Sequence, residues 1–247
     1  MKYFGGTDRG IRRTNQDSYV IATNENGDVF ALICDGIGGG RGGDVASQMA
    51  VSRFSVAFAA TGAFADQYAL KNWIRTRVSE VNRVIFDAGN ERPSLKGMGT
   101  TLCGVLITSV GTFIVNIGDS RCYTYSHRSG FRQITRDHSL VNDMLLHGEI
   151  TKEEAENYPQ KNVLTNALGV WETVRCDIET FNEKNDGFLI CSDGLHGYVD
   201  EDVIAGIVLN TKTDPARRTR KLIEAALDAG GYDNVTVILI DLEDSAV

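Results

Sequence analysis

The sequence contains no long hydrophobic run. Apolar residues never continue for the roughly 20 positions that a membrane-spanning helix needs. The opening segment, MKYFGGTDRG, also lacks the apolar stretch of a signal peptide. These absences argue against a membrane protein and a secreted one, and we expect a cytoplasmic protein with no membrane partner.

Proline is also scarce, with three residues in 247, and no Ser/Pro-rich linker or low-complexity tract divides the chain. No repeat with a period of roughly 20 to 50 residues is present, which excludes solenoids and propellers. Hydrophobic residues make up 42% of the chain and charged residues 23%, as in ordinary globular proteins. We therefore expect residues 1–247 to form a single domain.

Cysteine and histidine are few and unpatterned. The five cysteines are odd in number and show no CxxC spacing, and the four histidines show no metal-ligand spacing. Reduced, buried thiols explain this pattern better than disulfides or zinc. Basic residues are in the minority, and the formal net charge of −8 argues against a nucleic-acid partner.

The common nucleotide and hydrolase motifs are missing or out of context. GxxxxGK[ST] and GxSxG do not occur, so P-loop and α/β-hydrolase folds have no support. Gly38-x-Gly40-x-x-Gly43 matches the dinucleotide fingerprint. However, two strand-like segments precede it and no return strand follows within about 30 residues, so we do not expect a dinucleotide site.

The sequence does contain grouped strands and grouped helices. Strand-like runs at 2–6, 18–23 and 29–34 are followed by helical patterns at 44–60 and 70–85. Strand-like runs then fill 100–135, a polar helical segment covers 139–158, and further strands are expected at 172–181, 188–191 and 234–242. Two helices, at 201–209 and 215–229, precede the last strand. This grouping predicts an α+β fold with helices outside two antiparallel β-sheets.

Four aspartates share one arrangement, in which each stands at the end of an apolar strand and beside a glycine or a turn. They are Asp35 in ALICDG, Asp119 in IVNIGDS, Asp193 in FLICSDG and Asp233 in GGYDNVTVILI. A single Asp-Gly pair usually only makes a turn. Four carboxylates gathered at one rim would repel one another, and divalent cations would remove that repulsion. Carboxylate oxygens favour Mg²⁺ or Mn²⁺ over zinc.

Eight ordered motifs resemble those of the type 2C metal-dependent protein phosphatases, also called the PPM family. They are RRTNQDSY, CDGIGGGRGGDVAS, GMGTTLCG, NIGDSR, TRDHSLV, NVLTNALG, FLICSDGLHGYV and GYDNVTV. The match covers nearly the whole chain. The resemblance implies a four-layer α-β-β-α sandwich with a binuclear metal site in a cleft at one end.

The resemblance also implies a set of metal ligands for Mn²⁺ or Mg²⁺. Asp35 would bridge two cations, and the carbonyl of Gly36 would bind one of them. Asp193 and Asp233 would hold the other cation. Asp119 with Asp193 would supply a weaker third site, as in bacterial members of the family.

Two further residues receive catalytic roles by resemblance. Arg12 stands at the family's phosphate-binding position by its spacing to Asn15, and the adjacent Arg13 is a rival. Asp17 would orient the attacking water. A hydroxide bridging two cations would then attack phosphorus in line, with no covalent intermediate. The planar fork of an arginine can meet two phosphate oxygens, which a lysine cannot do.

The chain departs from the family in two places. The run from Ile37 to Arg41 contains no histidine, so no side chain is assigned to protonate the leaving group. Gln16 stands where many members have glutamate. Residues 139–168 correspond to the family's flap beside the cleft, although their composition is equally consistent with an ordinary surface helical hairpin.

The function implied by the resemblance is hydrolysis of phosphoserine and phosphothreonine in proteins, opposing a bacterial serine/threonine kinase. We expect a monomer. Two alternatives remain open from the residues: a pseudophosphatase that binds phosphoproteins without turnover, and a Mn²⁺-dependent hydrolase of small phosphate esters. Retention of all four aspartates argues against the first, and the cleft chemistry would be the same for the second.

Overall fold

The computed structural model describes residues 1–38, 42–156, 158–160 and 162–242. Its strands are β1 (Lys2–Asp8), β2 (Asp17–Thr23), β3 (Val29–Ile37), β4 (Gly99–Thr100), β5 (Leu102–Thr108), β6 (Gly111–Ile117), β7 (Arg121–Ser126), β8 (Gly130–Gln133), β9 (Asp177–Phe181), β10 (Gly187–Cys191) and β11 (Val235–Asp241). Its helices are α1 (Gly43–Ala59), α2 (Gln67–Glu91), the 3₁₀ turn η1 (Pro93–Leu95), α3 (Leu140–Leu146), α4 (Lys152–Glu156), α5 (Asp193–His196), α6 (Glu201–Val208) and α7 (Pro215–Asp228).

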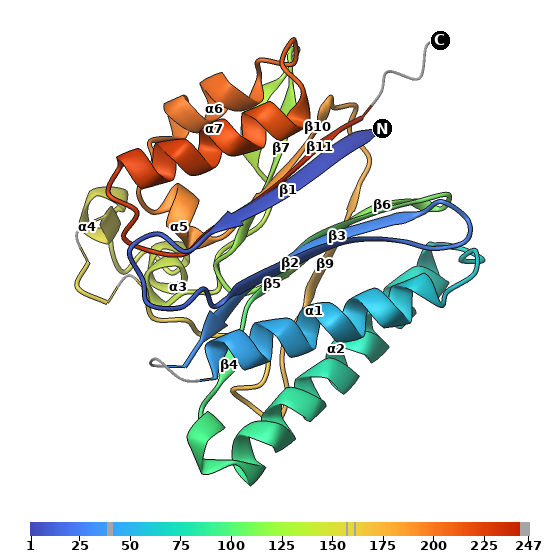
Figure 1. The fold of residues 1–247 in the computed structure, drawn as a ribbon, viewed down its shortest axis with the longest axis vertical. Helices are drawn as coiled ribbons and strands as arrows, with labels where there is room; N and C mark the ends of the chain where they lie inside the picture. Colours follow the sequence, from blue (N-terminus) through green and yellow to red (C-terminus); the bar gives the residue numbers. More distant parts are fainter. Residues whose placement is uncertain (39–41, 157, 161, 243–247) are drawn as a thin grey trace.

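The strands form two antiparallel sheets that pack face to face (Figure 1). One sheet has the order β1-β11-β10-β7-β8, and the other has the order β2-β3-β5-β6-β9 with β4 paired to β3. Helices α6 and α7 cover the outer face of the first sheet, and α1 and α2 cover the outer face of the second. This arrangement confirms the predicted α+β fold and its four α-β-β-α layers.

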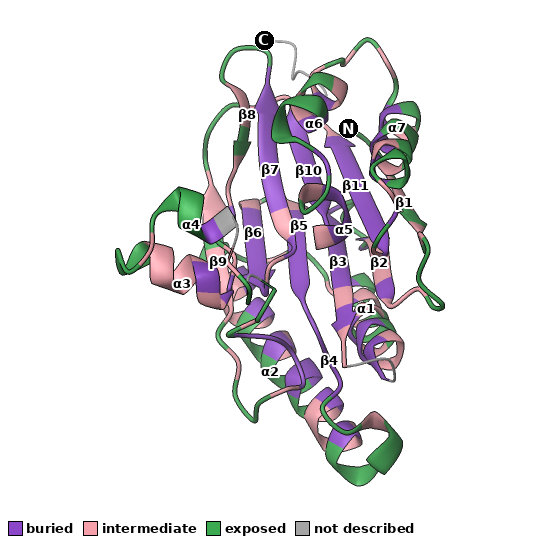
Figure 2. Cartoon of the chain, turned by 90° about the vertical axis from the view of Figure 1, so that its left-hand side faces the viewer, coloured by how far each residue is buried: buried purple, intermediate pink, exposed green. Residues whose placement is uncertain are grey.

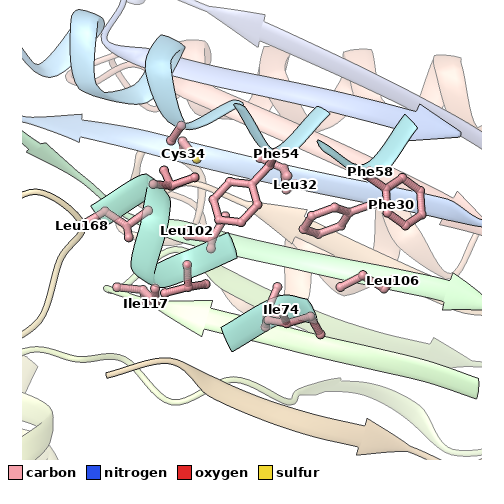
Figure 3. Close-up of a cluster of buried hydrophobic side chains, with 14 of the residues drawn as sticks. Phe30, Leu32, Cys34, Phe54, Phe58, Ile74, Leu102, Leu106, Ile117 and Leu168 are labelled. Atoms are coloured by element: carbon pink, nitrogen blue, oxygen red, sulfur yellow. The ribbon is translucent and has the colours of Figure 1, made fainter. Parts of the chain in front are cut away.

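The core has three parts, one between each pair of adjacent layers. Strand β3 is buried from Val29 to Cys34 because it is covered on both faces. Phe30 and Leu32 point toward α1 and α2, where Phe54 and Phe58 pack against them (Figure 3). The alternate residues of β3 instead face the first sheet. Figure 2 shows the burial concentrated in the central strands.

Helix α2 confirms the predicted amphipathic helix and extends it to residues 67–91. The side chain of Asp66 caps its start by accepting a hydrogen bond from the backbone N–H of Ala69, at 2.7 Å. Its buried face is made by Leu70, Ile74 and the residues that follow at helical spacing. Within the described ranges, neither this helix nor any other has both the length and the apolar character needed to cross a bilayer.

The segment expected as a strand from residue 172 is a strand only from Asp177 onward, so the prediction for residues 172–176 was wrong. Two asparagines hold this stretch away from the sheet. Asn82 of α2 donates to the carbonyls of Trp171 and Glu172, each at 3.0 Å. Asn166 donates to the carbonyl of Arg175 at 2.7 Å and accepts from its N–H.

Residues 139–168 contain two short helices, α3 and α4, as the polar helical pattern indicated. A capping box stands at the start of α4. The N–H of Thr151 donates to Glu154 Oε2 at 2.8 Å, and the N–H of Glu154 donates to Thr151 Oγ1 at 3.2 Å. Both helices lie at the same end of the sandwich as α5 (Figure 1).

Candidate active site at one end of the sandwich

The aspartates singled out in the sequence belong to loops and element ends that meet near α5. Asp35 lies two residues before the end of β3, and Asp17 begins β2 directly opposite it in the strand register. Asp119 lies in the turn between β6 and β7, Asp193 is the first residue of α5, and Asp233 precedes β11. Elements from both sheets therefore contribute carboxylates to one site.

Three of these carboxyl groups converge closely. The carboxyls of Asp17 and Asp193 are close enough to that of Asp35 for their charges to act on it. Burial raises the pKa of Asp35 well above its usual range, and the charges of Asp17 and Asp193 raise it further. Burial likewise raises the pKa of Asp17, although hydrogen bonds from Thr236 and Ser192 oppose the change.

Asp17, Asp35, Asp119, Asp193 and Asp233 together form what we call the acidic cluster, and the pKa values of Asp119 and Asp193 are also raised. Burial, together with the charge of Asp137, raises the pKa of Asp119 to about 6. Burial and the charges of Asp119 and Asp233 raise the pKa of Asp193 to about 8. Such shifts mark carboxylates that lack a compensating positive charge, which is a common property of functional sites.

The backbone around Asp35 is held by two threonines of the motif GMGTTLCG. The N–H of Asp35 donates to Thr101 Oγ1 at 2.9 Å. Its carbonyl accepts from Thr101 N–H and from the Thr100 hydroxyl, both at 2.8 Å. The next residue, Gly36, has to be glycine because a Cβ there would lie 2.1 Å from the carbonyl oxygen of Gly43. The strand end is thereby fixed against α1.

Gly194 brings the motif of Asp193 against that of Asp233. A Cβ on Gly194 would lie 1.9 Å from the carbonyl oxygen of Asn234, a separation that no side chain tolerates. The start of α5 therefore packs directly on the residues that lead into β11. Residue 194 is therefore glycine because of this close contact, and not because the backbone there needs a positive φ angle.

Asp17 is anchored by a buried hydroxyl network. Its Oδ2 accepts from Thr236 Oγ1 at 2.6 Å and from Ser192 Oγ at 2.8 Å, and Ser192 Oγ in turn accepts from Thr236 N–H. Its Oδ1 is buried and, among the described residues, receives no hydrogen bond. One oxygen of Asp17 is thus fixed while the other remains available to a ligand.

Arg12 reaches the same site from the loop before β2. Its Nε donates to the carbonyl of Tyr232 at 2.9 Å, and its Nη2 donates to Asp233 Oδ2 at 2.8 Å. Asn234 positions this loop by donating to the carbonyls of Arg9 and Thr14. The structure therefore places the guanidinium of Arg12 beside the aspartates.

The side chain of Arg12 is 54% exposed despite its ion pair with Asp233. Its remaining N–H groups are consequently accessible to an anion. The side chain of the adjacent Arg13 is exposed, and its carbonyl accepts from Arg9 Nη1 at 3.3 Å. This geometry favours Arg12 over Arg13 as the phosphate ligand.

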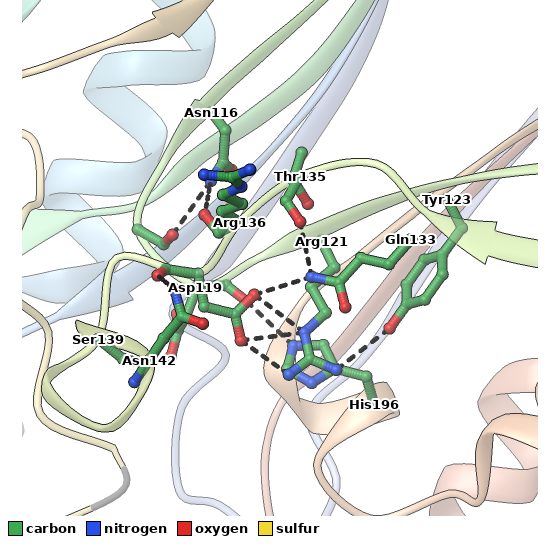
Figure 4. A network of polar contacts seen from close by, with 12 residues as sticks. Asn116, Asp119, Arg121, Tyr123, Gln133, Thr135, Arg136, Ser139, Asn142 and His196 are labelled. Carbon is green, nitrogen blue, oxygen red and sulfur yellow. Dashed lines mark hydrogen bonds and ion pairs between the residues drawn. The ribbon is translucent and has the colours of Figure 1, made fainter. Parts of the chain in front are cut away.

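A polar network borders Asp119 on the side of α3 (Figure 4). Arg121 Nη2 donates to Asp137 Oδ2 at 2.7 Å, and Arg121 Nε contacts both carboxylate oxygens. His196 Nε2 donates to the carbonyl of Asp119 at 3.1 Å. Burial and the charge of Arg121 lower the pKa of His196 to about 3, so this imidazole is neutral at pH 7 and is not a general acid there.

A cavity of about 680 Å³ opens next to this network. Asp119 and Asp193 line one end of it, and Val141, Leu145 and Ala155 from residues 139–168 line another part. The predicted flap segment therefore does border the aspartate cluster. Gly39, Gly40 and Arg41, which include part of the dinucleotide-like pattern and of the run without histidine, lie outside the described residues.

The side chains present suit hard divalent cations. Buried carboxylates with raised pKa values and an unpaired Asp17 Oδ1 are oxygen donors of the kind that Mg²⁺ and Mn²⁺ prefer. Within residues 1–38, 42–156, 158–160 and 162–242, no three His, Cys, Asp or Glu side chains already form a finished metal shell. Asp233 is engaged with Arg12 instead. The convergence of Asp17, Asp35 and Asp193 is the stronger observation because these carboxylates are shielded from solvent and raise the pKa of Asp35.

Comparison with known proteins decides the family. Residues 9–230 match the family model described as "Protein phosphatase 2C". This chain belongs to the protein phosphatase 2C family. The matched region contains Arg12, Asp17, Asp35, Asp119 and Asp193, and Asp233 follows it by three residues.

Relatives of this protein phosphatase 2C chain cover nearly its full length. A protein from Listeria welshimeri named "Serine/threonine phosphatase stp" is 39% identical over 239 residues, spanning 95% of this chain and 93% of the relative. "Protein phosphatase PhpP" from Streptococcus pneumoniae is 36% identical over 241 residues, spanning 96% of each. The solved structure of the phosphatase Stp1 from Staphylococcus aureus superposes with a TM-score of 0.90 at 35% identity, covering 98% of this chain and 95% of that one.

Several residues of this phosphatase 2C site were not singled out from the sequence. They are Thr100, Thr101, Asp137, Ser192, His196, Asn234 and Thr236. All of them lie within the eight motifs, so membership of a motif could have indicated that they belong to the site. These residues hydrogen-bond to the site residues and to the loops that carry them. Because many residue types can do this, the sequence alone does not identify them, and the contacts in the structure do.

Proposed function

We propose that this chain is a protein serine/threonine phosphatase that hydrolyses phosphoserine and phosphothreonine with the help of divalent cations. The observation that carries the proposal is the convergence of the buried Asp17 with the half-buried Asp35 and Asp193, beside the exposed guanidinium of Arg12. The names of the Listeria and Streptococcus relatives support the substrate class. Membership of the phosphatase 2C family supports the metal dependence.

The proposed ligand set contains only oxygen donors. Asp35, the carbonyl of Gly36, Asp193 and Asp233 would hold two Mn²⁺ or Mg²⁺ ions, and Asp119 with Asp193 would hold a weaker third. When bound, such cations acidify water for attack on phosphorus and neutralise charge in the transition state. The buried position of these carboxylates and their raised pKa values support this assignment.

Arg12 would bind the phosphoryl group of the substrate. Its contacts with the Tyr232 carbonyl and Asp233 fix the plane of the guanidinium, and the exposed N–H groups can donate to two phosphate oxygens at once. Because the side chain is held before substrate arrives, little rotamer entropy remains to be lost on binding. Arg12 would thus place phosphorus next to the aspartate cluster.

Asp17 would orient the attacking water. Ser192 and Thr236 hold its Oδ2, which leaves the buried Oδ1 as an acceptor for a water O–H. A water with its proton directed at Asp17 presents its lone pair to phosphorus. This role requires Asp17 to be ionised, and the positive charge of cations bound nearby would favour the ionised form.

One assay tests the proposal against its alternatives. Hydrolysis of a phosphothreonine peptide, para-nitrophenyl phosphate and a nucleotide is measured with and without Mn²⁺, for the wild type, Asp193→Ala and a control, Glu224→Gln, on the exposed face of α7. We expect Mn²⁺-dependent turnover that favours the peptide. Asp193→Ala should lower kcat by roughly 100-fold or more, because it removes a residue proposed to act on transition-state charge.

Three outcomes would contradict the proposal. Activity without metal, or activity that survives Asp193→Ala, would reject the metal mechanism. Turnover of the nucleotide and small ester without the peptide would indicate a hydrolase of small phosphate esters. Binding of the phosphopeptide without turnover of any substrate would indicate a pseudophosphatase.

We also propose that the enzyme opposes a serine/threonine kinase, that it acts as a monomer, and that residues 1–247 form one catalytic unit. Both sheets contribute to the site, with Asp35 on one and Asp193 after a strand of the other, which supports the single unit. Residues 139–168 border the cavity, which supports a role for them in substrate choice.

A further inference from the structure

Two exposed tyrosines stand together beside Arg12. The side chains of Tyr198 and Tyr232 come from segments 34 positions apart, yet their ring centroids lie 5.7 Å from each other at an interplanar angle of 40°. Tyr198 is 40% exposed and Tyr232 is 55% exposed. An aromatic pair in contact that remains open to solvent is a typical element of a binding surface.

The two rings lie at the entrance to the proposed site. The carbonyl of Tyr232 accepts the hydrogen bond from Arg12 Nε, so the ring belongs to the residue that positions the guanidinium. Tyr198 lines the same cavity as Asp119 and Asp193. Tyr198 therefore links the cavity to the exposed ring of Tyr232, with which it is in contact.

The backbone holds the Tyr232 ring in place. A Cβ on Gly230 would lie 2.3 Å from Tyr232 Cε2, which means that the ring packs flat over this glycine. The following carbonyl, of Gly231, accepts from the N–H of Ile11, whose side chain is 70% exposed. A third exposed apolar residue thus belongs to the segments that carry Arg12 and Tyr232.

We propose that Tyr198 and Tyr232 form a docking platform for an apolar side chain of the substrate protein, one or two positions from the phosphorylated residue. The proposal rests on the function proposed above. A phosphothreonine whose phosphate reaches Arg12 has neighbours about 3.5 Å further along an extended chain for each residue. The ring of Tyr232 is within reach of those neighbours, since its own carbonyl accepts the hydrogen bond from Arg12 Nε.

The chemistry of the surroundings favours an apolar neighbour over an acidic one. The rings offer apolar area with a small entropy cost, since a tyrosine has only two side-chain torsions to restrict. Asp200, Glu201 and Asp202 follow Tyr198 at the start of α6, and all three are exposed. An acidic side chain beside the phosphothreonine would meet these like charges and be disfavoured.

The experiment uses matched phosphothreonine peptides that differ only at the two positions on either side of the phosphorylated residue. Leucine, glycine, glutamate or lysine occupies these positions, and free phosphothreonine serves as the substrate without neighbours. The enzyme is the full chain with Mn²⁺, as wild type, Tyr198→Ala, Tyr232→Ala and Tyr232→Leu. Tyr68→Ala is the control, because Tyr68 is 72% exposed on α2 and belongs to the opposite outer layer.

We expect the wild type to favour the leucine peptide over the glycine peptide by roughly tenfold in kcat/KM, mostly through KM, as is usual for a modest apolar contact. Tyr198→Ala and Tyr232→Ala should each reduce this ratio to about twofold or less. Tyr232→Leu should retain most of the preference because it keeps apolar area. Tyr68→Ala should retain the full preference.

The outcomes separate this inference from the proposed function. No turnover of free phosphothreonine or of any peptide would overturn the function itself. Turnover with a leucine preference that survives Tyr198→Ala and Tyr232→Ala would overturn the platform alone. A preference for lysine that disappears in Glu201→Gln but not in Tyr232→Ala would also overturn it, because the surface would then select charge. Thermal melting of each variant identifies any that fails to fold, and the remaining tyrosine variants still decide the question.

Discussion

Arg12 is the residue to which we assign substrate capture. Its Nε and Nη2 already make two directed hydrogen bonds, to the Tyr232 carbonyl and to Asp233. The guanidinium is therefore oriented in the absence of substrate. A lysine at this position would keep the charge but lose the planar set of donors.

We predict that Arg12→Lys raises KM for phosphopeptides and lowers kcat/KM by roughly 10- to 100-fold, because one bidentate pairing becomes a single point contact. Steady-state kinetics on a phosphothreonine peptide measures this. Arg13→Lys is the matched control, since Arg13 is adjacent and exposed, and it should change kcat/KM by less than about twofold. Equal losses in the two variants would contradict the assignment of Arg12.

The sequence pattern predicted which aspartates gather at one end of the sandwich, while their roles as metal ligands stay a prediction. Asp35 and Asp193 each end an apolar strand and precede glycine, and Asp17 follows an Arg-x-x-Asn segment. Ser192 and Thr236 could not be predicted in the same way. Their role is to hydrogen-bond to Asp17, which is distant in the sequence. Serine and threonine occur throughout the chain, so the residue type alone does not indicate such a contact.

At the scale of elements, the strands with continuous apolar runs were predicted well. VFALIC in β3 is buried on both faces, and such a run has few other interpretations. The start of β9 and the short helix α5 were not predicted correctly. Asparagine side chains at residues 82 and 166 hold the segment before β9, and four residues are too few for helical periodicity to be visible.

The junction between α5 and β11 offers a test at this scale. We predict that Gly194→Ala destabilises the protein by roughly 2 to 4 kcal/mol, because the new methyl group would meet the backbone of Asn234 at 1.9 Å. It should also weaken Mn²⁺ binding, since Asp193 and Asp233 would be pushed apart. Urea denaturation and calorimetric titration of Mn²⁺ measure the two effects.

The control for this prediction is Gly206→Ala within α6. Apart from its own helix, no atom of the described residues lies within 4 Å of a Cβ at Gly206, and the residue sits in a regular helix. This substitution should therefore stabilise the protein by about 0.5 to 1 kcal/mol through helix propensity. If Gly194→Ala leaves the free energy of unfolding unchanged, the start of α5 can move away from the residues before β11 without loss of stability, which would contradict the prediction.

For the molecule as a whole, the acidic cluster sets the pH dependence of stability. Asp119 and Asp193 have folded-state pKa values raised to about 6 and about 8, above the values of unfolded aspartate. Between about pH 4 and pH 8 the folded protein therefore binds more protons than the unfolded one. The free energy of unfolding of the metal-free protein consequently falls as pH rises through this window.

We predict that in the presence of a chelator the protein is less stable at pH 8 than at pH 5, by ~2 kcal/mol or more in urea denaturation. Mn²⁺ should restore stability, and the gain should be larger at pH 8, where the carboxylates are ionised. Asp193→Asn should flatten the pH dependence in chelator because it removes the group with the higher of the two values. Stability that rises from pH 5 to pH 8 in chelator would contradict the prediction.

The first and the last strand of the chain are neighbours. Strand β1 pairs with β11 along its whole length, from Lys2 opposite Asp241 to Asp8 opposite Val235. In the sheet order, β11 separates β1 from β10, so β1 joins the sheet only through β11. The residues that lead into β11 include Asp233 and Asn234, which orient Arg12 and its loop.

This connection has a consequence for biosynthesis. A nascent chain on the ribosome can pair the strands of the second sheet early, since the last of them, β9, ends at Phe181. It cannot bring Asp233 to Asp193, or hold Arg12 in place, until β11 has been translated and released. With the roles proposed above, a chain that stops before β11 would lack the contacts that hold Arg12, and we expect it to be inactive.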